Sequence, residues 1–76
     1  MADAIVGLTG RLVLPTRGPD GPGEVRVTVR GSREVYAAWS PDPLPKGADV
    51  LIIGDRGARS VDVERWTTTS FDETDP

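Results

Sequence analysis

The chain has 76 residues, with no cysteine and no histidine, and twelve acidic residues against nine basic ones give a net charge of −3. This length suits one small domain, and the missing cysteine excludes disulfides, thiolate metal sites and thiol nucleophiles. The missing histidine removes the commonest acid–base catalyst near neutral pH, and a zinc site would need carboxylates alone. We therefore predict a small module that is not an enzyme and that holds no metal or cofactor.

Glycine and proline divide the chain into short segments. Nine glycines and seven prolines leave no room for a long helix, and the short apolar runs between them are typical of a small all-β barrel or sandwich. The first run predicts a strand over residues 5–14, with Leu8, Leu12 and Leu14 on one face. Gly10, inside this strand, is typical of a bulge or a barrel bend.

The next two strands form the clearest hairpin in the sequence. After a loop over residues 15–23 that is rich in glycine and proline, three valines alternate with polar residues over 24–30. This alternation predicts a strand with one apolar face. Gly31 and Ser32 are typical of a two-residue turn with glycine at its first central position. A third strand is expected over residues 33–39.

Two phases of the third strand are compatible with the sequence. Successive side chains of a strand alternate between its faces, so a shift of one residue exchanges the inner and outer sets. The sequence pattern alone places Val35 and Trp39 inside the barrel, whereas the opposite phase places Tyr36 and Ala38 there. The environment of Trp39 depends on this choice.

The second proline-rich connection carries Leu44, which we expect to plug the barrel from below. Residues 49–54 then form the most apolar strand, and half of this apolar run must be core. Its other residues, Leu51 and Ile53, are expected to be covered by Leu14 or by the N-terminal residues, because large exposed apolar patches are uncommon on monomers. The alternative is that they mark an edge for a partner.

The last strand is expected over residues 59–66, after a turn over residues 55–58. Val61 and Val63 alternate with acidic residues, which predicts that the two valines point inward. Trp66 is expected to close the bottom of the barrel.

The domain organisation follows from these elements: a short extension over residues 1–3, a barrel over 4–66 and a disordered acidic tail over 67–76. Three of the twelve acidic residues and no basic residue lie in 71–76, so nine acids and nine bases remain in 1–70. No run approaches the ~18 apolar residues of a membrane helix, and no basic signal-peptide start is present. We expect a soluble, cytoplasmic protein without direct membrane insertion.

The order of these features resembles the soluble C-terminal domain of the NfeD-like family, over residues 5–66. The individual motifs are short, and their order and spacing carry the resemblance. The motifs are Gly7-Leu8-Thr9-Gly10, Pro22-Gly23, Gly31, Tyr36-Ala37-Ala38-Trp39-Ser40, Pro45-Lys46-Gly47-Ala48-Asp49-Val50, Ile53-Gly54 and Val61-Asp62-Val63-Glu64.

The resemblance implies a five-stranded barrel like the oligonucleotide/oligosaccharide-binding (OB) fold, without catalytic residues of its own. It also implies association with membrane scaffolds of the stomatin, prohibitin or flotillin type. In the family the barrel usually follows membrane helices, and this chain starts almost at the barrel. We therefore expect any link to the membrane to come from a partner protein.

The candidate partner-binding residues lie on the second and third strands. Arg26, Thr28 and Arg30 share the polar face of the second strand, and Tyr36 and Trp39 are the nearest aromatic residues. The resemblance favours the phase with Tyr36 inside, which turns Trp39 outward, beside Arg26 and Arg30. Tryptophan and arginine dominate binding hot spots, so we expect Trp39 to anchor a protein partner.

The sequence offers little for catalysis or phosphate binding. Asp62 and Glu64 share the outer face of one strand, where exposed charge is the default. The glycines of the first loop lack the Lys-Ser/Thr pair and the following helix of a phosphate-binding loop.

Single-stranded nucleic-acid binding is the alternative function. OB folds bind oligonucleotides over the second and third strands, where Arg26, Thr28 and Arg30 lie. Scarce aromatic residues and interspersed acids argue against it, since single-strand binders need stacking platforms. We therefore predict a monomeric, non-catalytic protein-interaction module that serves a stomatin- or flotillin-like membrane protein in trans.

Overall fold

The computed structural model describes residues 5–67. The expected extension over residues 1–3 and all but the first residue of the expected tail, 67–76, lie outside the described residues. The elements are β1 (Thr9–Leu14), a 3₁₀ helix η1 (Gly18–Asp20), β2 (Gly23–Val29), β3 (Ser32–Trp39), β4 (Asp49–Gly57) and β5 (Ser60–Arg65).

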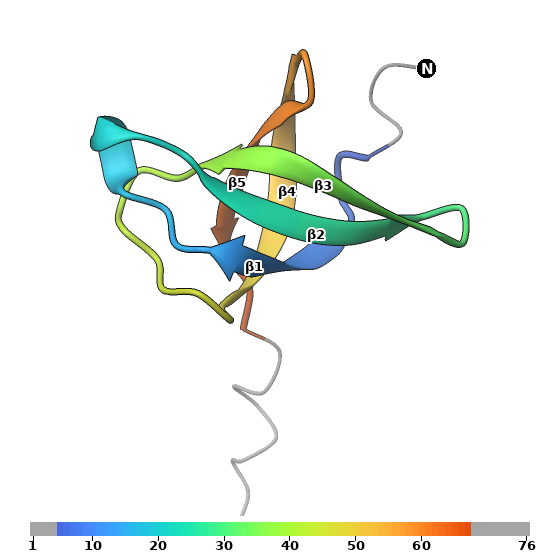
Figure 1. The fold of residues 1–76 in the computed structure, drawn as a ribbon, viewed down its shortest axis with the longest axis horizontal. Coiled ribbons are helices and arrows are strands. Elements are labelled where there is room, and N and C mark those ends of the chain that lie inside the picture. Colours follow the sequence, from blue (N-terminus) through green and yellow to red (C-terminus); the bar gives the residue numbers. More distant parts are fainter. Residues whose placement is uncertain (1–4, 68–76) are drawn as a thin grey trace, which may run out of the picture.

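The five strands close into a barrel in the order β1-β2-β3-β5-β4, with β4 pairing back to β1. All neighbours are antiparallel except β3 and β5, which are parallel. Figure 1 shows β4 and β5 crossing behind the other three strands, while the β2–β3 hairpin extends beyond the barrel. The predicted all-β, five-stranded OB-like barrel is therefore confirmed.

The core consists of the inward residues of the alternating strands. Val25 and Val27 are buried on β2 while Arg26 between them is exposed, as the alternation predicts. Burying an aliphatic side chain contributes roughly 1.5–3 kcal/mol, so this small set supplies most of the stability. The buried apolar residues are Ile5, Leu12, Val25, Val27, Ala38, Val50, Ile52, Val61 and Val63.

A bulge in β1 changes the phase of that strand. The register with β2 shifts between Leu12 and Leu14, so Leu12 is buried whereas Leu14 is 49% exposed. The prediction that Leu14 shares the inner face is wrong, because one extra residue reverses the alternation. The bulge expected at Gly10 lies instead between Leu12 and Leu14, and Gly10 pairs with Val50 in regular register. The glycine allows close packing of β1 on β2, because a Cβ there would lie 2.5 Å from the Val27 side chain and 2.6 Å from the Arg26 carbonyl oxygen.

Both hairpin turns differ from the sequence-based expectation. The β2–β3 turn consists of Arg30 and Gly31, with φ of 54° and 83°, rather than Gly31 and Ser32. Strand β4 runs on to Gly57, and the β4–β5 turn consists of Ala58 and Arg59, with φ of 53° and 58°. Two positive φ values in a two-residue turn match the twist of the flanking strands. The strand twist therefore determines which two residues form each turn.

Two buried hydroxyl groups join the proline-rich connections. The side-chain oxygens of Thr16 and Ser40 lie 2.6 Å apart, and the Leu44 N–H donates to Thr16 Oγ1 at 2.8 Å. The Thr16 N–H donates in turn to the Leu44 carbonyl at 3.0 Å. Leu44 is thereby held against the core, which confirms its predicted role as a plug.

The structure decides the phase of β3. Ala38 is buried and Tyr36 packs against the core, whereas Val35 is 41% exposed. This is the phase that the family resemblance favours.

Two expectations about covered apolar residues are wrong. Ile53 is 48% exposed, so neither Leu14 nor the N-terminal residues cover it, whereas Leu51 is half-buried. Trp66 is 39% exposed and does not close the barrel bottom. The backbone N–H of Trp66 donates to the Asp49 carbonyl at 2.9 Å and so continues the hydrogen bonding between β5 and β4. This pairing places the indole on the outer face of the barrel.

Candidate protein-interaction surface

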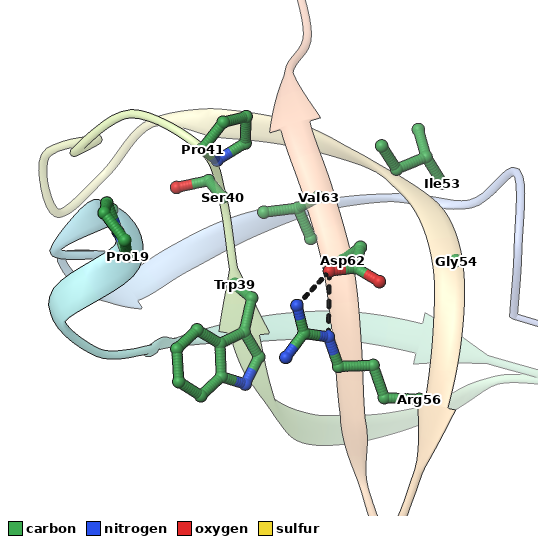
Figure 2. Close-up of a pocket in the computed structure, with 10 residues that line it drawn as sticks. Pro19, Trp39, Ser40, Pro41, Ile53, Gly54, Arg56, Asp62 and Val63 are labelled. Atoms are coloured by element: carbon green, nitrogen blue, oxygen red, sulfur yellow. Dashed lines mark hydrogen bonds and ion pairs between the residues drawn. The ribbon is translucent and has the colours of Figure 1, made fainter.

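Trp39, Arg56 and Asp62 meet on the outside of the barrel, where β3, β4 and β5 adjoin. Trp39 and Asp62 are register partners on the parallel strands β3 and β5. The Arg56 guanidinium carbon lies 4.7 Å from the centre of the Trp39 ring system. Arg56 Nε and Nη2 each lie 2.9 Å from Asp62 Oδ1. Figure 2 shows the guanidinium between the indole and the carboxylate.

Apolar side chains and proline rings surround this group and form an open groove, here called the Trp39 groove. The exposed Ile53 contributes apolar surface from β4, and Gly54 leaves room for Asp62, since a Cβ at Gly54 would lie 3.2 Å from Asp62 Oδ2. The two proline-rich connections supply the far wall (Figure 2). The groove is lined by Gly18, Pro19, Trp39, Ser40, Pro41, Ile53, Gly54, Arg56, Asp62 and Val63.

The Trp39 groove has the composition of a binding hot spot. Tryptophan and arginine are the residues most enriched in such sites. A cation over an indole contributes about 0.5–2 kcal/mol, more when water is excluded. The Arg56–Asp62 pair is partly exposed, so it adds little stability, but together with the Trp39 ring it gives the guanidinium two neighbours that favour this position. A side chain that is already ordered loses less entropy when a partner binds.

The Trp39 groove contains few ionisable side chains. Among its lining residues, the only ionisable ones are Asp62 and Arg56, which pair with each other. Across residues 5–67, no three potential metal-ligating side chains gather into a group that could hold an ion.

The structure separates the five residues predicted to form one patch. Arg26 and Thr28 lie outward on β2, and Arg30 is in the turn. Trp39 faces outward as expected, but the prediction that it lies beside Arg26 and Arg30 is wrong. Arg26 pairs with Val35, four residues before Trp39, which is about 13 Å along an extended strand.

Tyr36 lies apart from the other four predicted residues, on the inner side of β3. There it packs against the core and carries the Arg59 guanidinium 4.7 Å from its ring centre. Its ring is therefore not available as a stacking platform on the outer face next to Arg26.

Sequence analysis missed Arg56 and Asp62 as parts of this surface, and it offered Ile53 only as the alternative of a partner edge. Asp62 was expected to be a solvated charge on a strand face, and Arg56 was placed in a turn. Two irregularities in the β4–β5 register, between Ile52 and Gly54 and between Asp55 and Gly57, bring Arg56 over Trp39. Bulges leave no periodic signal, so strand alternation could not reveal this contact.

The sequence model of the family described as the NfeD C-terminal domain matches residues 9–64. The chain belongs to the NfeD C-terminal domain family. Comparison with curated proteins gave no match. Residues 5–67 include no helix with the length and hydropathy needed to cross a bilayer.

Solved structures of NfeD domains have the same barrel. The C-terminal domain of stomatin operon partner protein 1510-C from Pyrococcus horikoshii is 24% identical, covering 90% of this chain and 97% of that one, with a TM-score of 0.66. The soluble domain of the NfeD protein YuaF from Bacillus subtilis is 23% identical, covering 83% and 75%, with a TM-score of 0.70.

A third similar structure comes from Corynebacterium glutamicum, the soluble domain of a membrane protein implicated in regulation of membrane protease activity. It is 18% identical, covering 88% of this chain and 100% of that one, with a TM-score of 0.61. At these identities the structures establish the fold of this NfeD domain, as the family resemblance implied.

Proposed function

We propose that this NfeD domain is a non-catalytic protein-interaction module that binds a segment of a stomatin-, prohibitin- or flotillin-type membrane scaffold in the Trp39 groove. The domain stays in the cytoplasm as a monomer and reaches the membrane through this partner. One relative is named a stomatin operon partner protein, which supports this class of partner.

The observation that carries the proposal is the Arg56 guanidinium, fixed between the Trp39 ring and the Asp62 carboxylate. An exposed Ile53 beside this group adds apolar area that water covers in the free protein. Burying such area against a partner is favourable at about 25 cal/mol per Å². The groove thus offers a rigid aromatic and cationic centre with an apolar rim, the arrangement found in hot spots.

Nucleic-acid binding is less well supported by the same geometry. Bases need aromatic faces next to the cations that hold the phosphates. Tyr36 faces the barrel, and Trp39 lies on a different part of the surface from Arg26 and Arg30. The OB face over β2 and β3 therefore lacks the two platforms that the sequence suggested.

The test is binding to a purified stomatin-type protein from the same organism, measured by biolayer interferometry on full-length chain. We expect Trp39→Ala to weaken binding at least about tenfold, the effect of losing one hot-spot residue. Leu14→Ala is the control, because it removes an exposed apolar side chain outside the groove. Equal affinities of the two variants, with unchanged circular dichroism, would exclude Trp39 as the anchor.

A further inference from the structure

A row of outward side chains crosses the barrel away from the Trp39 groove. We call it the arginine row, and it runs from Trp66 through Asp49, Arg11 and Arg26 to Val35. Asp49 pairs with Arg11 on β1, Arg11 pairs with Arg26 on β2, and Arg26 pairs with Val35 on β3. At the end of the row opposite Val35, the backbone N–H of Trp66 donates to the Asp49 carbonyl.

All five side chains of the arginine row are exposed. The inward residues next to them in sequence are Val50, Leu12 and Val25, all buried, so the row occupies the opposite phase. Trp66 and Val35, at the two ends, are 39% and 41% exposed. Four members of the row, Arg11, Arg26, Asp49 and Trp66, also line an open groove over β1 and β2, whereas Val35 lies outside it.

The arginine row carries two positive charges, on Arg11 and Arg26, and one negative charge, on Asp49. Arg11 Nε lies 3.3 Å from Asp49 Oδ1, an exposed and therefore weak pair. No ion pair involves Arg26 among the residues that the structure describes. Arg26 instead stands directly opposite Arg11, and like charges on paired strand positions are unfavourable. An anion at Arg26 would relieve this repulsion.

We propose that the arginine row binds an extended acidic segment of a partner protein. A carboxylate of this segment pairs with Arg26, and apolar side chains on either side pack on Trp66 and Val35. The five strand positions span four strand spacings, which is about 19 Å at ~4.8 Å each. An extended peptide covers this length in about six residues. The matching segment therefore has two apolar residues about six positions apart, with one acidic residue between them that meets Arg26.

The row favours a peptide over a nucleic acid. A peptide can place a single carboxylate at Arg26 and leave Asp49 paired with Arg11. A nucleic acid carries a charge on every phosphate, so it would also meet the carboxylates of Asp49 and Glu24, both exposed on this face. Only one aromatic ring, Trp66, belongs to the row, whereas single-strand binders stack successive bases.

The test is a titration of ¹⁵N-labelled full chain, followed by amide shifts, with a synthetic peptide that has two leucines six positions apart and one glutamate between them. The controls are a peptide with glutamine in place of glutamate and a single-stranded oligonucleotide of similar length. We expect shifts at Arg11, Arg26, Val35 and Trp66 with the acidic peptide only. Added salt should weaken binding, since the contact is electrostatic.

The variants separate this proposal from the one above. Arg26→Gln should weaken the acidic peptide about fivefold, at the upper end of an exposed ion pair, while Trp39→Ala should leave it unchanged. Because Arg26 is exposed on the surface, folding is retained. Equal binding of the glutamine peptide, equal affinity of Arg26→Gln, or tighter binding of the oligonucleotide would each overturn the proposal. None of these results bears on the Trp39 groove.

Discussion

Replacing Ala58 with glycine should stabilise the domain. Ala58 has φ of 53° in the β4–β5 turn, a left-handed conformation that costs a residue with a Cβ about 1–2 kcal/mol. Glycine removes this cost but adds freedom to the unfolded chain, worth about 0.4–1 kcal/mol. The expected net gain in the free energy of unfolding is about 0.5–1 kcal/mol. For a domain of this size it raises Tm by about 2–8 °C.

Two further variants make the measurement specific to the turn backbone. Arg59 has φ of 58°, but its guanidinium also donates to the Val35 carbonyl at 2.9 Å and to Glu34 at 3.1 Å. It covers the Tyr36 ring as well. Arg59→Gly should therefore give no gain, because the lost side-chain contacts, about 1–2 kcal/mol together, offset the relief of the backbone.

Ala37→Gly is the matched control, because Ala37 lies in the regular part of β3. There glycine should lower the free energy of unfolding by about 0.5–1 kcal/mol. Thermal and urea unfolding followed by circular dichroism would give all three values. If Ala58→Gly destabilised the domain as much as Ala37→Gly does, the turn would not impose the left-handed cost and the reasoning would be refuted.

Two other substitutions probe the core and the loops. Thr16→Val should cost about 1–3 kcal/mol, because it leaves the Leu44 N–H without its acceptor; Thr16→Ser keeps the hydroxyl, and urea unfolding should show a smaller loss. Gly10→Ala should cost about 1–3 kcal/mol through the clash with Val27. A Gly10→Ala variant with wild-type Tm would show that β1 and β2 move apart at this position without loss of stability.

Strand alternation and turn residues were sufficient to predict the barrel, because its inner face is a set of aliphatic side chains at a period of two. Val25 and Val27 follow this rule. The rule failed where a bulge intervenes, as at Leu14 and around Ile53. It failed again at Arg30, where the twist of the hairpin required a turn one residue earlier than the glycine suggested.

The candidate surface was harder to predict than the fold. The sequence indicated Trp39 as an outward residue only through the family resemblance, and it gave no sign that Arg56 and Asp62 would join it. Those contacts depend on the parallel pairing of β3 with β5 and on the shifted register of β4. Both are long-range features of a closed barrel, which no local pattern encodes.

The two proposed surfaces use different parts of the same strands. On β3, Val35 belongs to the arginine row and Trp39 to the groove, about 13 Å further along. On β4, Asp49 lies at the start of the strand and Arg56 near its end. One partner segment in the Trp39 groove would therefore leave the arginine row free for a second. If both proposals hold, the barrel connects two protein segments at once, and Trp39→Ala and Arg26→Gln should each weaken the binding of one segment only.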